Sequence, residues 1–339
     1  SWVNGTVTLT AGNLYPMYHV FSENGGGDYS YLRWKNPDGA WVSLKNSDRA
    51  SDGTGYYFTS GAVGGGGGGV DTGVYLTGNV NIAADTTITS ANATINVTGN
   101  ISSSSGKDLI VDSSTFDADN ISNLDVLTIK SSTATVGTLD TINTATIESA
   151  SYTGNAISSV DALEIQSTTL SVTGNIETDT SLTFNSSSNL SIANVITGTG
   201  QLIKSNTNQL TLTGTNDFTG GVNLSAGTLA LNSAAAIGSS GTVVLSGGTL
   251  KYSSSNTTDY SSRFSTANDQ KYNIDTNSQS ITFASDLTSS GGILTKTGNG
   301  TLTLSGTNTY TGGTNISGGS ILLNSAGAIG STGTLLFNG

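Results

Sequence analysis

Residues 200–247 read GQLIKSNTNQLTLTGTNDFTGGVNLSAGTLALNSAAAIGSSGTVVLSG, and residues 292–339 read GILTKTGNGTLTLSGTNTYTGGTNISGGSILLNSAGAIGSTGTLLFNG. The two segments lie 92 residues apart and agree at about half of their aligned positions. Self-similarity at a fixed spacing is typical of repeat proteins, in which each unit buries its apolar face against the next. The repeat therefore predicts a stacked architecture whose function is to reach, to present or to bind.

Short runs inside each segment alternate polar and apolar residues, as in residues 301–304, 211–213 and 315–317. These runs are rich in Thr, Leu, Ile and Val and are bounded by Gly, Asn and Ser, which is the pattern of β-strands. Glycine pairs follow where a coil has to turn, because glycine reaches positive φ without steric cost. Almost no stretch places apolar residues three and four apart over several turns, so helices are not expected.

The middle of the chain has a finer period, marked by asparagines that follow strand-like residues. Successive gaps of 21, 20, 35, 20 and 19 residues separate Asn79, Asn100, Asn120, Asn155, Asn175 and Asn194. The gap of 35 is interpreted as two shortened coils around Val136 and Gly137. An Asn at the same turn of successive coils can bond its amide to the turns above and below it, so we expect a structural ladder.

A period near twenty residues suits one coil of a right-handed parallel β-helix, with coils about 4.8 Å apart. We therefore predict an all-β fold in which residues 71–339 form a β-helix (β-solenoid). A β-sandwich built of hairpins is the alternative fold, but it leaves both periods unexplained.

Composition narrows the class of protein further. A hydrophobic fraction of 35% suits a thin coil, and a net charge of −12, from 23 acidic and 11 basic residues, argues against nucleic acid or an anionic membrane as partner. The chain has no cysteine, which excludes disulfides and thiolate metal sites and fits a protein that crosses a membrane unfolded.

No signal peptide and no apolar run long enough to span a bilayer is present, so we expect that Ser1 is not the first residue of the gene product. We likewise expect the coil that is unfinished at Gly339 to continue.

The first part of the chain has a different composition. All three tryptophans, both prolines, the histidine and the methionine lie within the first 41 residues, and six glycines at residues 64–69 follow. We therefore predict a β-hairpin head at residues 1–63, a Gly-rich linker at residues 64–70 and a stalk at residues 71–339. The expected head strands are residues 7–9, 18–21 and 29–34, with turns at residues 25–27 and 36–39.

The head segments LTAG, YP, ENGGG and LRWKNPDG resemble the closing strands of the protective-antigen-type lectin module. That resemblance is partial, covers about 45 residues, and omits the paired aspartates that chelate calcium in sugar-binding members. Binding of cell-surface glycans is what the resemblance implies for the head.

The long repeat resembles the autotransporter-associated β-strand repeat of bacterial type V secreted passengers and surface adhesins. The residues in the family's order are Lys296, Gly298, Gly300, Leu302, Leu304, Gly306, Asn308, Tyr310, Gly312, Gly313, Leu322, Ala328, Ile329 and Gly330, and the first copy has Leu212, Gly214, Asn216, Phe218, Gly220 and Gly221 at matching positions. The resemblance covers two units of the chain. It implies a parallel β-helix stalk, exposure on the cell surface and roles in adhesion or self-association, without catalytic residues of its own.

A search for catalytic and metal-binding patterns finds little. The lone His19 excludes a multi-histidine metal site, and no GxSxG or phosphate-loop motif occurs. Asp117, Asp119 and Asn120 form a small oxygen cluster for calcium, but it lacks the further ligands that calcium requires. We expect no cofactor and no enzyme activity.

The function predicted from the sequence is that of a structural and adhesive stalk of a bacterial surface or secreted protein, with matrix, biofilm or fibre formation among its roles. Its expected partners are further copies of itself, neighbouring surface proteins and surface glycans. Two alternatives stay open. One is a filament subunit completed by neighbouring chains. The other is a polysaccharide-acting β-helix enzyme that pairs acids on adjacent coils, such as Asp161 and Glu164 with Asp140 or Glu148.

Overall fold

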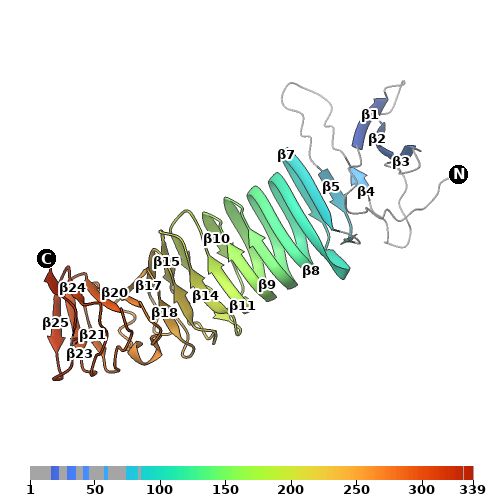
Figure 1. Ribbon diagram of the computed structural model, residues 1–339. Coiled ribbons are helices and arrows are strands. Elements are labelled where there is room, and N and C mark those ends of the chain that lie inside the picture. The colour runs from blue at the N-terminus through green and yellow to red at the C-terminus, as the bar shows by residue number, and fades with distance from the viewer. Residues whose placement is uncertain are drawn as a thin grey trace. The chain divides into compact units, whose positions relative to one another are not determined.

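The computed structural model describes residues 17–22, 29–35, 41–45, 57–59, 74–82, 85–330 and 332–338. Apart from one short 3₁₀ turn, its regular elements are all β-strands. The chain forms two compact units, residues 1–156 and residues 157–339. Parallel pairing joins successive coils within each unit (Figure 1), which confirms the predicted parallel β-helix.

The first unit begins with an antiparallel sheet of three strands in the order β1 (Met17–Ser22), β2 (Tyr29–Lys35) and β3 (Trp41–Lys45). Two of the expected head strands therefore exist, each slightly longer than predicted. The expected strand at residues 7–9, both head turns and the Gly-rich linker at residues 64–70 lie outside the described residues. The predicted domain boundaries accordingly stay a prediction.

Parallel pairing starts soon afterwards. β4 (Tyr57–Thr59) pairs antiparallel with β5 (Val74–Thr77), and β5 pairs parallel with β7 (Thr86–Thr98). β6 (Val80–Asn81) and β7 then pair parallel with β8 (Ile101–Ile147), a segment of 47 residues that turns corners at positive-φ residues such as Asn123 and Thr141. β9 (Ser151–Ile165) follows, beginning in the first unit and ending in the second.

Coils in β8 are shorter than twenty residues. Hydrogen bonds join Asn120 to Thr138, Asp125 to Asn143, and Ser131 to Ser149, and each of these pairs is 18 residues apart. Buried residues recur at the same spacing; they are Phe116, Ala118, Ile121, Leu124, Leu127 and Ile129, followed by Ala134, Val136, Leu139, Ile142, Ala145 and Ile147. This confirms that the 35-residue gap between asparagines contains two shortened coils.

The second unit stacks short strands separated by turns. Strands from residue 176 to residue 251, which include those of the first repeat, lie on two faces. One face has β11 (Ile176–Phe184), β14 (Gln201–Lys204), β16 (Val222–Leu224) and β18 (Val243–Leu245). The other has β12 (Leu190–Ile192), β15 (Gln209–Leu212), β17 (Thr228–Leu231) and β19 (Thr249–Lys251). β10 (Thr169–Val172) pairs with β9, and β13 (Ile196–Thr197) pairs with β11. We call the sheet that contains β11, β14, β16 and β18 the first face, and the sheet that contains β12, β15, β17 and β19 the second face.

The second repeat is displaced by one face. Its strands β22 (Ile293–Thr297), β24 (Thr314–Ile316) and β26 (Leu335–Phe337) extend the second face, to which β20 (Lys271–Asp275) also belongs. Their sequence equivalents β14, β16 and β18 are on the first face. β21 (Gln279–Phe283), β23 (Gly300–Leu304) and β25 (Ser320–Leu323) make a third face.

The segment between the repeats, residues 248–291, produces this displacement. It carries the short 3₁₀ turn η1 (Ser261–Arg263) and a group of aromatic rings. Phe264 packs edge-on against Phe283, with ring centroids 5.2 Å apart, and lies 5.9 Å from the ring of Tyr272. Phe264 also forms an isolated parallel bridge with Val243 of β18. It therefore covers β18, which is the last strand of the first face.

The core is a set of ladders of equivalent residues. On the second face Leu190, Leu210, Leu229, Leu250 and Ile274 are in register from coil to coil. All of them point inward, and each is almost or wholly buried. Such a one-dimensional core gives each coil contacts mainly with the coils immediately before and after it.

Candidate functional site

Each repeat has one asparagine that links three consecutive coils. The side-chain carbonyl of Asn216 accepts the backbone N–H of Ile196 at 2.8 Å, and its amide donates to the carbonyl of Ala236 at 2.6 Å. Asn308 makes the matching pair of bonds, from the N–H of Leu287 at 2.7 Å and to the carbonyl of Ala328. Both side chains are only 3% exposed. We call these two side chains the coil clamps.

Glycines allow the turns beside the clamps to approach each other. Gly221 and Gly313 have φ angles of 80° and 96°, a region that disfavours any residue with a Cβ. A Cβ on Gly221 would also lie 2.2 Å from the carbonyl oxygen of Thr242 on the next coil. Among the glycines predicted to mark the repeat, Gly214, Gly220, Gly306 and Gly312 abut the preceding coil.

The remaining residues predicted to mark the repeat belong to the core. Leu212, Leu304, Phe218 and Tyr310 are fully buried. The hydroxyl of Tyr310 lies 2.6 Å from Oγ1 of Thr314, which satisfies its polar end inside the coil. The two equivalent aromatic residues therefore stabilise the repeat and are not available to a partner.

A buried lysine also occurs in each repeat. Lys204 is 3% exposed and Lys296 is fully buried, and both occupy inward positions of their strands. Lys296 lies in register between Ile274 and Ile316. Its ammonium donates to three carbonyl oxygens, of Thr297 at 2.8 Å, Gly298 at 2.7 Å and Gly318 at 3.0 Å.

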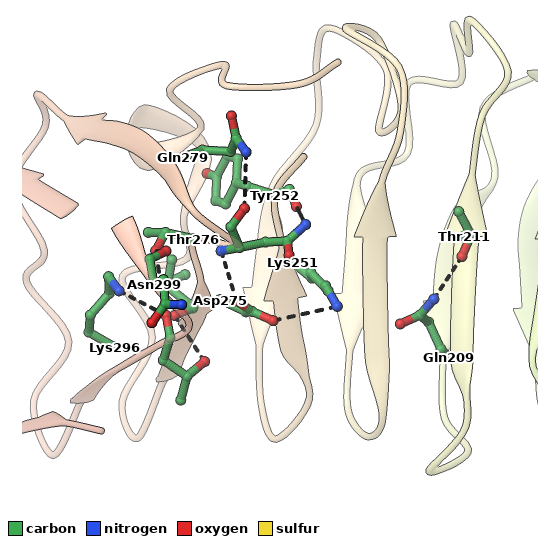
Figure 2. A network of polar contacts seen from close by, with 12 residues as sticks. Gln209, Thr211, Lys251, Tyr252, Asp275, Thr276, Gln279, Lys296 and Asn299 are labelled. Atoms are coloured by element: carbon green, nitrogen blue, oxygen red, sulfur yellow. Dashed lines mark hydrogen bonds and ion pairs between the residues drawn. The ribbon is translucent and has the colours of Figure 1, made fainter. Parts of the chain in front are cut away.

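Figure 2 shows the polar contacts around this corner. Burial lowers the pKa of Lys296, and the nearby carboxylate of Asp275 partly opposes that shift. Asp275 itself forms an ion pair of 3.8 Å with Lys251. Thr276 donates from its hydroxyl to the carbonyl of Asn299 at 2.8 Å, which ties two further coils together. Backbone carbonyl dipoles stabilise the buried charge of Lys296, and Lys251 on the preceding coil balances the charge of Asp275.

The predicted asparagine ladder exists at several of its positions. The carbonyl of Asn79 accepts the N–H of Asn100, and Asn120 donates to the side-chain carbonyl of Asn100 at 2.8 Å. Asn194 donates to the carbonyls of Val172 and Gly174, both at 2.6 Å. The ladder satisfies turn carbonyls and amides, as the sequence predicted.

The calcium candidates Asp117, Asp119 and Asn120 lie in β8 and stay a prediction. Asn120 uses its side-chain oxygen to accept the N–H of Thr138 at 2.9 Å. Asp117 is half-buried and Asp119 is exposed, on either side of the inward Ala118 in β8. In the part of the chain that the structure describes, no group of three or more His, Cys, Asp or Glu side chains is placed to hold a metal ion.

Two of the acids considered for a glycosidase have other partners. Glu164 accepts hydrogen bonds from Gln166 and Asn185, both at 3.0 Å. Glu148 forms an ion pair of 3.5 Å with Lys130. His19 lies in β1, opposite Leu32.

Sequence reasoning missed Arg263, which lies in η1. Its guanidinium donates to the carbonyls of Gly241 at 2.9 Å, Gly238 at 2.8 Å, Ile237 at 3.0 Å and Ser240. The guanidinium carbon also lies 5.6 Å from the centre of the Tyr260 ring. The sequence signal that could have identified Arg263 is the rarity of basic residues, because Lys and Arg together number only 11 in the chain.

A family profile described as the passenger-associated-transport-repeat matches residues 202–231 and 294–323. These two stretches are similar to passenger-associated transport repeats, and we call them the transport repeats. The matches begin at the inward residues Leu202 and Leu294 and end with the strands β17 and β25. Each transport repeat therefore contains a buried lysine, a coil clamp and a glycine pair. The predicted resemblance to the autotransporter-associated β-strand repeat is confirmed.

The chain is also similar to a protein described as an adhesin autotransporter, BmaC, of Brucella suis biovar 1 (strain 1330). The two are 36% identical over 106 residues, which is 31% of this chain and 3% of the relative. The chain therefore spans a small fraction of that relative's length. No solved structure matches. No helix in the described part of the chain is long and apolar enough to cross a membrane.

Proposed function

We propose that this chain is part of an autotransporter passenger that is displayed at the bacterial surface and acts as an adhesive scaffold, associating laterally with further copies of itself. Its transport repeats and its similarity to a protein described as an autotransporter adhesin support the adhesive class. Neighbouring surface proteins and surface glycans are the other partners that we propose.

The observation that carries lateral association is a ladder of hydroxyls on the third face. Ser280, Thr301 and Ser320 are in register on β21, β23 and β25, and Thr282 and Thr303 form a parallel row beside them. The side-chain oxygens of Thr301 and Ser320 lie 2.9 Å apart, which orders the row. All five are outward-facing and at least partly exposed.

Short hydroxyl side chains lose little conformational entropy on contact, because they have few rotamers. Each contact between two such rows is weak, but a regular row makes many of them at once, and linked weak contacts add to a large avidity. A stacked fold supplies the regularity, since equivalent residues recur at the inter-strand spacing.

The experiment is analytical ultracentrifugation of the full chain over a range of concentrations. Thr301→Lys with Thr303→Lys places two like charges on the hydroxyl rows, and we expect this variant to stay monomeric where the wild type associates. Thr215→Lys with Thr309→Lys is the matched control, because both threonines are exposed and lie in turns away from the rows.

Two results contradict the proposal in different ways. Association that survives the row variant but disappears in Phe337→Ser shows end-to-end contact, the filament alternative, because Phe337 is 68% exposed on the last strand. Hydrolysis of a polysaccharide that Glu164→Gln abolishes shows the enzyme alternative instead.

A further inference from the structure

The first face ends in a groove, because the coil that follows β18 does not continue the sheet. Phe264 pairs with Val243 through a single bridge, and the N–H of Ser265 donates to the carbonyl of Val243 at 2.9 Å. The chain then leaves the edge of β18, and the side chain of Gln270 accepts the N–H of Leu245 at 2.9 Å in place of a backbone carbonyl. Backbone pairing therefore stops early, beside the short turn η1.

The groove at this point has the size of a small-ligand site. Its volume is about 680 Å³, and it is open to solvent. Binding sites for small ligands occupy roughly 300–1,000 Å³. Two segments of the chain line the groove, residues 241–242 and residues 262–267. We call these residues the η1 groove.

Arg263 brings a positive charge into the groove that no carboxylate balances. Its printed acceptors are all backbone carbonyls, and no ion pair in the described part of the chain includes it. A carbonyl dipole stabilises a cation but carries no net charge. Burial lowers the pKa of the Arg263 guanidinium, as expected for a cation that is partly withdrawn from water without a counter-ion. The groove is therefore suited to a ligand that brings a negative charge.

One donor of this guanidinium is unused. A guanidinium presents five N–H groups. Nε and Nη1 of Arg263 each donate once, to the carbonyls of Gly241 at 2.9 Å and Gly238 at 2.8 Å. Nη2 donates twice, to the carbonyls of Ile237 at 3.0 Å and Ser240. The second N–H of Nη1 has no acceptor among the described residues and is available to a ligand.

Three hydroxyl groups of the groove are available as well. Thr242, Ser262 and Thr266 are exposed, and their hydroxyls make no hydrogen bond within the described part of the chain. Each hydroxyl can donate one hydrogen bond and accept two. The η1 groove thus combines one cationic donor with three neutral hydroxyls, and no acidic side chain lines it.

We propose that the η1 groove binds the carboxylate of a uronic acid unit in a surface polysaccharide. The carboxylate accepts the unused N–H of Arg263 and supplies the missing negative charge, in a charge-assisted hydrogen bond. The free hydroxyls of the groove bond the hydroxyls of the sugar ring. One carboxylate matches one guanidinium, whereas a phosphate monoester carries about two charges. This inference rests on the proposed adhesive function and names the class of glycan that the chain binds.

Titration calorimetry and NMR of the full chain test the proposal. The ligand is a tetrasaccharide of alternating glucuronic acid and N-acetylglucosamine, and its uncharged match is the same tetrasaccharide with the carboxylates converted to methyl esters. Thr266→Glu places a carboxylate in the groove, which competes with the ligand for the guanidinium. Thr309→Glu adds the same charge to an exposed turn outside the groove and is the matched control. Arg263→Gln is unsuitable, because it also deprives four carbonyls of their donor.

We expect the acidic tetrasaccharide to shift the amide signals of residues 241–242 and 262–267. It should bind about tenfold more tightly than its methyl ester, which is the difference that one charge-assisted hydrogen bond makes. Thr266→Glu should weaken binding about tenfold, and Thr309→Glu should leave it unchanged. Equal affinities for the acid and the ester, or an unchanged affinity in Thr266→Glu, overturn the proposal. Inorganic sulfate or phosphate that binds as tightly as the tetrasaccharide identifies a general anion site and also overturns it.

Ultracentrifugation of the same variants separates this inference from lateral association. Thr266→Glu should associate as the wild type does, because the groove lies at the end of the first face and the hydroxyl rows lie on the third. A chain that associates but does not bind the tetrasaccharide overturns this inference alone. A chain that binds the tetrasaccharide but does not associate overturns only the lateral association proposed above.

Discussion

Removing one coil clamp tests how the stack is held together. In Asn216→Ala the N–H of Ile196 and the carbonyl of Ala236 both lose the side chain that satisfies them. These two groups belong to different coils, about 20 residues before and after the clamp. The substitution therefore loosens two coil-to-coil junctions at once.

The magnitude follows from burial. Asn216 is 3% exposed, so water does not readily replace the lost partners. Leaving a buried polar group unsatisfied costs about 1–3 kcal/mol, which gives about 2–6 kcal/mol for the pair. At the lower limit the amide of Ile196 exchanges about 30-fold faster, since each 1.4 kcal/mol is a factor of ten.

Hydrogen exchange of the full chain is the suitable assay, because a stacked fold opens coil by coil and a single melting temperature averages over its parts. Thr215→Ala and Asp217→Ala are the controls, since both neighbours of the clamp are exposed. Asn308→Ala repeats the test in the second repeat, where the amide of Leu287 reports. Unchanged exchange at Ile196 and Leu287, or equal effects in the controls, would refute the clamp.

Three further predictions concern the core. Leu304→Asp places an unpaired carboxylate at a fully buried position and costs several kcal/mol, whereas Thr303→Asp points outward; equal protease sensitivity of the two variants would contradict the observed register. Burial lowers the pKa of Lys296 below its ordinary 10.5, so between the lowered value and 10.5 the unfolded chain binds more protons and the free energy of unfolding rises with pH. Denaturation of Lys296→Met at several pH values should show a smaller rise, and an identical slope would argue against a titrating buried ammonium. The hydroxyls of Tyr152 and Tyr252 are buried without a hydrogen-bond partner among the described residues, so Phe at either position should leave stability unchanged or raise it, as thermal melting would show.

Local patterns predicted the coils well because a β-helix has to return to the same corner every 18 to 24 residues. The alternation at residues 301–304 identified Leu304 as inward, and the asparagines marked turns whose amides need partners. The irregular spacing between Asn120 and Asn155 also predicted the shortened coils correctly, because a coil of 18 residues still brings the chain back to the same corner.

The features that sequence reasoning missed depend on contacts between distant coils. In the sequence, Lys296 is a polar interruption of a strand, and one of the three carbonyls that accept its ammonium belongs to Gly318 on the following coil. Arg263 lies in a segment without a recognisable period, and its four acceptors are more than twenty residues earlier. The displacement of the second repeat depends on where Phe264 ends the first face, which no local pattern encodes.

The displacement of the second repeat determines on which sides of the unit the outer surfaces of the two repeats lie. Two copies of one sequence motif would ordinarily be expected to present their outer surfaces side by side to a single flat partner. Here β14 and its equivalent β22 are on different faces of the same unit, so the outer surface of the second repeat is turned away from that of the first. A partner that recognises this surface meets it once on each of two sides. We propose that the unit bridges two partners rather than holding one partner twice.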